Sequence, residues 1–373
     1  MTAAPDFDPK VYGDRPRKHK DNGQAKERGQ AKPVEFPRML TAEDFIAGYV
    51  PQRPLIKAWD MKSGWLYSLT APTGGAKTAI ALAESFRLAG EGKRVLYLAG
   101  ENPDDVRGRT ILMKAKLELD QLPKSLFFCD HAFNLHEGMD HVRGEVQARG
   151  GVDLIFVDTS PAFQVASGAV DENSNPESIR WAMRQRELTG LDGKPAVVGL
   201  CHPIKRPQSI EDCLPRGGGG YLAQVDGNYA IWQIAEDGDD IFFDFRWVGK
   251  FRGSFEPLTY YLQRATCPEL LDVDGNPVKS VWARRADEQQ MERAAKDQAE
   301  DEAAILIAMT DYPGKSLAGW AKLLGWKTDN GNPAKNRVDR GIKRLAKHKL
   351  VRKGRNDRWH LLAAGKKRLS RSP

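Results

Sequence analysis

The chain has 373 residues, of which 40% are hydrophobic and 29% are charged, with 57 Lys and Arg against 50 Asp and Glu. The hydrophobic fraction excludes a wholly disordered chain, and the length predicts two or three domains with a large core. No apolar run approaches the roughly 18 residues of a membrane span, no secretory signal is visible, and the four cysteines form no CxxC pair. We therefore expect a cytoplasmic protein with no membrane partner, zinc site or disulfide framework.

The net charge of +7 is distributed unevenly along the chain. Residues 301–373 carry 18 basic and 6 acidic side chains, a net charge of +12, which leaves −5 for residues 1–300. A basic segment on a near-neutral body predicts an appendage that binds a polyanion. Residues 1–37 contain hardly any apolar residue, so we expect a disordered basic arm there.

After this arm, apolar strands alternate with helices. Thr41 is the expected N-cap of a short first helix, with which the folded part begins. Strands are expected at 65–70, 94–99, 126–129, 153–157 and 196–200, and helices at 78–89, 103–118, 137–149 and 176–189. Strands without polar alternation, separated by helices, predict an α/β fold: a mostly parallel sheet with helices on both faces. Two further strands, 229–234 and 241–247, predict a β-hairpin at the edge of the sheet.

The composition changes again near residue 281. Residues 281–302 are rich in Ala, Arg, Glu and Gln and predict a linker helix, and residues 303–373 predict a small α+β domain. Helices expected at 303–309, 316–324 and 333–348, followed by two short strands, have the order of a winged-helix domain.

The third of these helices is strongly basic. Its apolar residues fall on one stripe, so we expect the basic side chains to point outward and bind nucleic acid. The basic residues are Lys335, Arg337, Arg340, Lys343, Arg344 and Lys347, and the stripe is Val338, Ile342 and Leu345. The alternative is a solvated basic helix without a partner.

Residues 71–78, with the sequence APTGGAKT, lie between the first strand and the first long helix. This context is typical of a phosphate-binding loop, in which backbone N–H groups and the helix N-terminus surround phosphates. The alternative is an ordinary strand–helix turn. The expected nucleotide-binding residues are Thr73, Gly74, Gly75, Ala76, Lys77 and Thr78, with Lys77 on the β- and γ-phosphates and Thr78 on Mg²⁺. Ala71 and Ala76 replace glycines of the usual pattern, and a negative φ at Ala76 would make its methyl group tolerable.

Polar residues follow three other strands of the predicted sheet. The carboxyl ends of adjacent parallel strands meet at the ligand crevice, so these residues are expected near the loop. Asp158 is the expected second Mg²⁺ ligand, Glu101 the expected base for an attacking water, and His202 the expected γ-phosphate sensor. Each has an ordinary alternative as a strand-end Asp, a solvated Glu at a helix start or a structural His.

Residues 40–265 resemble RecA-like P-loop ATPases, specifically the RepA-like hexameric replicative helicases of plasmids and phages. The matching segments are APTGGAKT, LYLAGENP, LIFVDTSPAF, GLCHPIK and LPRGGGGYLAQVDG. The resemblance implies ATP and Mg²⁺ as cofactors, a RecA-like ATPase domain over residues 38–280 and a homo-hexamer. It also implies that Glu101, Lys77 and His202 are catalytic.

The resemblance further implies an arginine finger that reaches the neighbouring subunit. Arg216 matches the family's Arg-Gly-Ser loop, with Gly218 in place of the Ser, and Lys250 and Arg252 match a Lys-x-Arg segment. A solvated Arg in a Gly-rich loop is the alternative for both. Residues 204–221 are the expected channel loop for single-stranded DNA, and the C-terminal domain is the expected site for duplex DNA.

The function implied is that of an ATP-dependent DNA helicase or translocase in plasmid or phage DNA replication. Two alternatives belong to other classes. One is a DNA-binding replication initiator or regulator that ATP switches without unwinding, and the other is a recombinase-like filament ATPase.

Overall fold

The computed structural model describes residues 39–169, 171, 174–204, 207–217, 219–328, 331–354 and 358–369. The chain divides into two units, residues 1–51 and 52–373. The arm expected at residues 1–37 lies outside the described residues. In the first unit Thr41 caps α1 (Ala42–Ile46) as predicted, because its hydroxyl accepts a hydrogen bond from the N–H of Asp44 at 3.1 Å. No residue of α1 is buried, so this helix adds nothing to a core.

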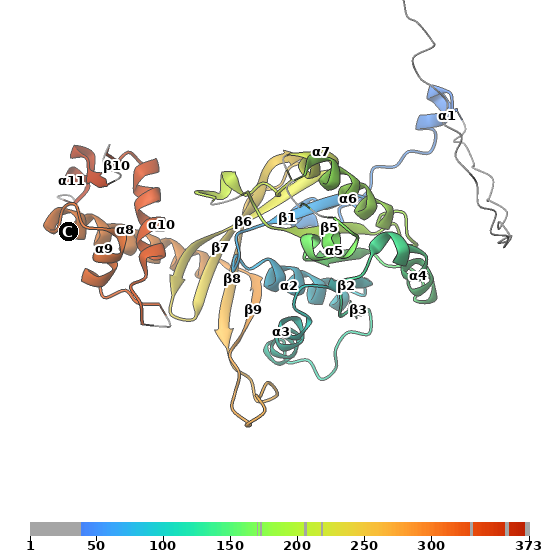
Figure 1. Ribbon diagram of the computed structural model, residues 1–373, viewed down its shortest axis with the longest axis horizontal. Helices are drawn as coiled ribbons and strands as arrows, with labels where there is room; N and C mark the ends of the chain where they lie inside the picture. The colour runs from blue at the N-terminus through green and yellow to red at the C-terminus, as the bar shows by residue number, and fades with distance from the viewer. Residues whose placement is uncertain are drawn as a thin grey trace, which may run out of the picture. The chain divides into compact units, whose positions relative to one another are not determined.

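A nine-stranded sheet lies at the centre of the second unit, in the order β3-β2-β4-β5-β1-β6-β7-β8-β9 (Figure 1). The strands from β3 to β6 pair in parallel, and those from β6 to β9 pair antiparallel. This arrangement confirms the α/β fold with a mostly parallel sheet. The strands are β1 (Leu66–Thr70), β2 (Val95–Ala99), β3 (Leu126–Cys129), β4 (Leu154–Asp158), β5 (Ala196–Cys201), β6 (Gly227–Asp237), β7 (Asp240–Phe251), β8 (Leu258–Ala265) and β9 (Ser280–Arg285).

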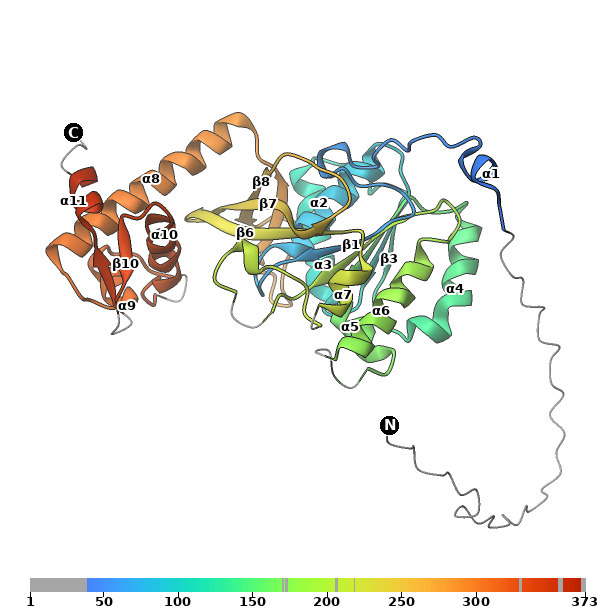
Figure 2. The same cartoon turned by 90° about the horizontal axis from the view of Figure 1, so that it is seen from above.

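Helices cover both faces of this sheet (Figure 2). Successive side chains of a strand point to opposite faces, so β4 places Phe156 in one core and Ile155 and Val157 in the other. This double burial explains why the strands show no polar alternation. One face carries α2 (Lys77–Gly90) and α3 (Pro103–Lys116), and the other carries α4 (Leu135–Ala148), α5 (Ser160–Ala166), α6 (Asn175–Leu188) and α7 (Gly220–Gln224). Two short 3-10 helices are Lys57–Trp59 and Ile210–Asp212.

The antiparallel part of the sheet corrects two expectations. The predicted hairpin exists as β6 and β7, but it does not lie at the edge, because β8 and β9 continue the sheet beyond it. The linker helix expected at residues 281–302 is wrong over its first residues, which form β9. The helix α8 (Glu288–Asp311) begins only where Asp287 and Gln290 form a capping box. The Ala and Arg content of β9 concealed the strand, whose pairing with β8 is a long-range contact.

The two unexpected strands are tied to the helix that follows the phosphate loop. Glu84 of α2 is 1% exposed. It accepts a hydrogen bond from the hydroxyl of Tyr260 at 2.5 Å and two from the guanidinium of Arg285 at 2.8 Å each. A buried carboxylate needs such partners, because an unpaired buried charge is strongly destabilising. The cluster therefore fixes β8 and β9 against α2.

Residues 300–369 form what we call the C-terminal bundle, with α8 running from the sheet into it (Figure 2). Its own core contains Ile305, Trp320, Val338, Ile342 and Leu345. The predicted helices and hairpin are confirmed as the end of α8, α9 (Leu317–Leu323), α10 (Lys335–Lys347), β10 (Val351–Lys353) and β11 (Trp359–Leu361), to which α11 (Ala363–Leu369) is added. Within the described ranges, no helix has both the length and the apolar character needed to cross a membrane.

The basic face of α10 differs from the expectation. Its apolar stripe is buried as predicted, but three of its arginines point toward acidic partners instead of outward. Arg337 binds both carboxylate oxygens of Asp301, Arg340 binds Glu236, and Arg344 binds Glu302. These partners lie on α8 and β6, so only the tertiary fold brings them beside α10.

Candidate functional site

The polar residues predicted to act together lie at the carboxyl ends of the central parallel strands. The strands β2, β4, β5 and β1 are neighbours. Glu101 follows β2, Asp158 ends β4, His202 follows β5, and the loop at residues 71–78 follows β1. Together with the loop residues Thr73, Gly74, Gly75, Ala76, Lys77 and Thr78, they line one cavity of about 360 Å³. The structure thus brings all predicted nucleotide and metal ligands to one place.

The loop at residues 71–78 turns tightly before α2. Gly74 has φ +74°, and a Cβ on Gly75 would lie 2.8 Å from the carbonyl oxygen of Pro72. Ala76 has φ +66°, so the condition under which its methyl group would be easily tolerated, a negative φ, is not met. The left-handed conformation costs an L-residue roughly 1–2 kcal/mol. Ala76 is the N-cap of α2, which begins at the next residue, Lys77.

Lys77 is held inside the loop that it belongs to. Its side-chain Nζ donates hydrogen bonds to the carbonyl oxygens of Ala71 at 2.9 Å and Pro72 at 3.3 Å. Lys77 is 7% exposed. Burial lowers the pKa of Lys77, although the negative charges of Asp158 and Glu101 act in the opposite direction. The cavity therefore contains a desolvated cation positioned to bind an anion.

Asp158 lines the cavity beside Thr78 and is buried. One carboxylate oxygen accepts hydrogen bonds from the hydroxyls of Thr78 at 2.8 Å and Tyr97 at 2.6 Å. Burial raises the pKa of Asp158, and this effect outweighs the hydrogen bonds and the charge of Lys77, which lower it. A threonine hydroxyl beside a carboxylate is an oxygen donor set that suits Mg²⁺. These residues therefore fit the metal expected from the sequence.

Tyr97 was missed by the sequence analysis. It is buried within β2, and its hydroxyl fixes the orientation of the Asp158 carboxylate. Burial raises the pKa of Tyr97, with the charge of Asp158 adding to the shift, so the phenol remains a hydrogen-bond donor. The alternation of side chains along β2 could have predicted that Tyr97 faces α2. Its contact with Asp158 could not have been predicted, because it depends on the pairing of β2 with β4.

The far wall of the cavity comes from the antiparallel strands. Four apolar residues of this wall, Ile241, Phe243, Leu262 and Val281, lie on β7, β8 and β9. The polar residues Gln233 on β6 and Arg264 on β8 also line the cavity. The sequence predicted β6 and β7 as a hairpin at the edge of the sheet but did not predict β8 and β9, so it did not place this wall beside the loop. An apolar wall opposite a phosphate loop suits a ligand with a flat apolar group and an anionic tail.

A further ion pair lies on α3 at the mouth of the cavity. The Arg109 Nε donates to a carboxylate oxygen of Asp105 at 2.5 Å, and both residues line the cavity together with Asn102. Asn102 caps α3 by accepting from the N–H of Asp105 at 3.2 Å. The sequence did not single out this ion pair, because oppositely charged residues four positions apart are common on helices.

The arginine-finger candidates do not line the cavity of their own chain. Arg216 lies next to it, since its N–H donates to the carbonyl oxygen of His202 at 3.0 Å. Arg252 forms an ion pair of 3.1 Å with Asp226, which lies beside the beginning of β1. Lys250 is close to Arg252 in sequence, at the end of β7. This is the opposite end of the sheet from the phosphate loop. Lys205, Arg206 and Gly218, also assigned to the expected loops, lie outside the described residues.

The Asp158→Asn variant is expected to be about 1 kcal/mol more stable than the wild-type protein without ligand. The raised pKa of Asp158 means that the ionised carboxylate costs folding free energy above that pKa, and the amide removes this cost. The difference should therefore develop as the pH rises from the unfolded-state pKa toward the raised folded-state pKa, and vanish toward about pH 3, where most of the carboxyl is protonated in both states. Urea unfolding of both proteins between about pH 3 and pH 8 measures it. Equal stability at neutral pH would contradict the burial argument.

Comparison with known proteins agrees with this geometry. Residues 30–208 match the AAA domain family, and the matched range contains the phosphate loop, Glu101, Asp158 and His202. The chain is similar to a KaiC-like protein from the hyperthermophilic archaeon Pyrococcus horikoshii OT3, at 15% identity and a TM-score of 0.38, over 58% of this chain and 89% of that chain. A second similar structure is the ATPase domain of another protein, at 11% identity and a TM-score of 0.40, over 59% of this chain and 86% of that chain. The comparison with curated proteins gave no match. Residues 30–208, which hold the phosphate loop and the residues that meet it, are therefore similar to the AAA domain family.

Proposed function

We propose that this protein is an ATP-dependent DNA helicase or translocase of the RepA-like hexameric type, acting in plasmid or phage DNA replication. The observation that supports it most is the single cavity in which the phosphate loop, Glu101, Asp158 and His202 meet. The match of residues 30–208 to the AAA domain family supports the same ATPase chemistry.

In this proposal each part of the cavity takes one part of ATP. The phosphates lie on the loop at residues 71–78, and the ammonium of Lys77 exchanges its carbonyl partners for the β- and γ-phosphates. The base packs on the apolar wall of β7 to β9. Glu101 accepts a proton from the attacking water, and His202 contacts the γ-phosphate. Thr78 and Asp158 hold Mg²⁺, which neutralises phosphate charge when bound.

The position of the remaining basic residues supports an assembly of several copies. Lys250 and Arg252 lie at the opposite end of the sheet from their own cavity, so they would act in a neighbouring subunit's site. Arg216, beside His202, is the other candidate. An arginine finger contributes about 10³–10⁵ to the rate because it meets charge that develops on the phosphoryl group. A homo-hexamer would bring such residues to every site.

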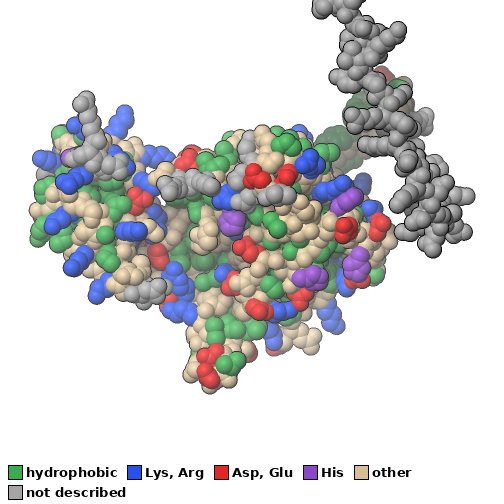
Figure 3. All heavy atoms as spheres, viewed as in Figure 1, with side chains coloured by type: hydrophobic (Ala, Val, Ile, Leu, Met, Phe, Trp, Pro, Cys, Tyr) green, Lys and Arg blue, Asp and Glu red, His purple; other side chains and the backbone are tan. Residues whose placement is uncertain are grey.

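We propose that DNA is bound at two places. Residues 204–221 would contact single-stranded DNA in the channel of the ring, and the C-terminal bundle would bind duplex DNA as a winged-helix domain. Figure 3 shows Lys and Arg side chains over the surface of this bundle. Since Arg337, Arg340 and Arg344 have intramolecular partners, the proposed phosphate contacts fall on exposed residues near the ends of α10 and on β10 and α11. They are Lys335, Lys347, Lys349, Arg352 and Lys366.

The experiment that tests this function measures ATP hydrolysis with and without single-stranded DNA, unwinding of a forked duplex, and the mass of the assembly with ATP. We expect hydrolysis that DNA stimulates and unwinding that requires ATP and Mg²⁺, from a ring of several copies. Absence of ATP-dependent unwinding or translocation by the assembled protein would overturn the proposal. Sequence-specific duplex binding with negligible DNA-stimulated turnover would favour an ATP-switched initiator or regulator, and a helical filament would favour a recombinase-like ATPase.

A further inference from the structure

The β6–β7 hairpin joins the cavity to the C-terminal bundle. Arg293 of α8 binds Asp237 and Asp240 at the tip of the hairpin, at 2.8 Å each. Arg344 of α10 donates to the carbonyl oxygen of Ile234 at 3.1 Å. Ala294 of α8 packs in a small apolar cluster with residues of β6, β7 and β8. Both the first half of α8, which leads into the bundle, and α10 of the bundle itself therefore contact the strands that form the far wall of the cavity.

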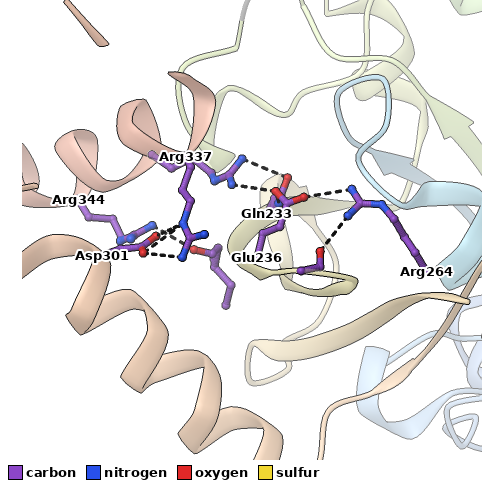
Figure 4. Close-up of polar contacts among 9 residues, drawn as sticks. Gln233, Glu236, Arg264, Asp301, Arg337 and Arg344 are labelled. Atoms are coloured by element: carbon purple, nitrogen blue, oxygen red, sulfur yellow. Dashed lines mark hydrogen bonds and ion pairs between the residues drawn. The ribbon is translucent and has the colours of Figure 1, made fainter. Parts of the chain in front are cut away.

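Glu236 of β6 binds one arginine from each side of this joint (Figure 4). Its Oε1 accepts from Arg264 of β8 at 3.1 Å, and its Oε2 accepts from Arg340 of α10 at 3.2 Å. Gln233 completes the cluster, since its Nε2 donates to Glu236 at 2.7 Å and its Oε1 accepts from Arg340 at 3.2 Å. The side chain of Arg340 is 16% exposed and that of Glu236 is 30% exposed. The interaction is thus partly shielded from solvent.

The protonation state of Glu236 suits an ion pair with two arginines. Burial raises the pKa of Glu236, but the hydrogen bonds from Gln233 and Arg264 and the charges of Arg340 and Arg264 outweigh burial and hold the pKa below its usual value. Glu236 is therefore a carboxylate at neutral pH. Two guanidinium groups share one negative charge and repel each other, so each is held less tightly than it would be alone.

The same cluster forms part of the cavity that we assign to ATP. Arg264 and Gln233 both line it, and the side chain of Arg264 is 26% exposed. A nucleotide in the cavity is an anion and competes with Glu236 for the guanidinium of Arg264. The strength with which Glu236 holds Arg264 therefore affects nucleotide binding.

We propose that Glu236 couples nucleotide binding to docking of the C-terminal bundle, with Arg264 as a nucleotide-contacting residue whose availability depends on Arg340. With α10 docked, Arg340 shares the carboxylate and Arg264 can turn to the nucleotide. When α10 leaves the hairpin, Glu236 holds Arg264 alone and withdraws it from the cavity. By linkage, bound nucleotide stabilises the docked bundle to the same extent. Of the proposed function, this inference requires only that the cavity binds ATP.

The test compares the affinity of the full-length protein for a fluorescent non-hydrolysable ATP analogue with Mg²⁺ among matched variants. Arg340→Ala is expected to weaken binding about fivefold or more, near the lower end of typical coupling between sites. Glu236→Gln removes the competing charge, so it should bind at least as tightly as the wild-type protein, and adding Arg340→Ala to it should change nothing further. Lys296→Ala removes an exposed cation of α8 that pairs with Glu300 of the same helix, and it should leave affinity unchanged.

A second measurement follows the docking itself. Hydrogen exchange of the backbone amides of α10 and β6 should slow when the analogue binds, and Arg340→Ala should abolish this protection. The coupling is overturned if Arg340→Ala binds the analogue like Lys296→Ala, or if it weakens binding equally in the Glu236→Gln background. If the wild-type protein does not bind the analogue, the proposed function fails and the coupling with it. Binding by the wild-type protein without an effect of Arg340→Ala overturns the coupling alone.

Discussion

The Glu101→Gln variant is expected to bind ATP and Mg²⁺ as tightly as the wild-type protein and to hydrolyse ATP about 10²–10⁴-fold more slowly. Glu101 follows β2 and lines the cavity, and its N–H donates to the carbonyl oxygen of Asp158 at 3.3 Å, which fixes its backbone beside the metal ligands. Glutamine keeps the size and polarity of the side chain but cannot accept the proton from water. The variant therefore removes the chemical step and leaves the phosphate contacts.

Single-turnover hydrolysis and nucleotide binding measured on the same preparation separate these two effects. Glu137→Gln is the matched control, because Glu137 is an exposed acid in the first turn of α4 and lies outside the cavity. Its rate should equal that of the wild-type protein. Hydrolysis by Glu101→Gln within about twofold of the wild-type rate would exclude Glu101 as the base.

The Lys77→Met variant is expected to lose both nucleotide binding and hydrolysis, with the rate falling about 10²–10³-fold or more. Methionine is one atom shorter than lysine and equally unbranched, and it removes the only charge that the loop at residues 71–78 offers to phosphates. The effect differs from that of Glu101→Gln, since the ground state loses its phosphate contacts as well. DNA unwinding by this variant should therefore be undetectable.

The stability of Lys77→Met shows whether the loss of nucleotide binding comes from the missing charge or from unfolding of the protein. Burial lowers the pKa of Lys77, so the ionised side chain costs folding free energy, which offsets the two hydrogen bonds to loop carbonyls that the substitution removes. We therefore expect a melting temperature close to that of the wild-type protein. Lys116→Met, at the exposed end of α3, is the control for the same change of side chain. Nucleotide affinity that is unchanged in Lys77→Met would refute the phosphate-loop assignment.

The two variants also distinguish an ATP switch from a motor. A switch that uses ATP only for assembly should remain functional in Glu101→Gln, which still binds ATP, and fail in Lys77→Met. A helicase or translocase should fail in both, because movement along DNA requires repeated hydrolysis.

Much of the parallel half of the sheet was predictable from the sequence. Each of its central strands is buried on both faces, so the strand itself is a continuous apolar run such as residues 154–157. The residues after these strands were predicted to meet because parallel strands present their carboxyl ends at one edge. The structure places Glu101, Asp158 and His202 there. Their catalytic roles stay predictions.

The antiparallel half could not be predicted in the same way. The strands β8 and β9 are partly exposed and contain Arg, Gln and Ser, and the Ala and Arg residues at the end of β9 continue without a break into the Ala-, Glu- and Gln-rich helix that follows. Their strand conformation depends on pairing with β7 and on Arg285 reaching the buried Glu84. The wall of the cavity on these strands remained hidden for the same reason.

The sequence by itself determined the strand–loop–helix context of residues 71–78, the five parallel strands before residue 201 with the longer helices between them, and the uneven charge that leaves +12 on residues 301–373. These are local properties: turn chemistry, periodicity and composition. Only the tertiary structure decided where that charge is directed. The arginines of α10 meet Asp301, Glu302 and Glu236, which are 36 or more residues away in sequence, because a cation that is largely shielded from water needs a carboxylate partner wherever the fold supplies one.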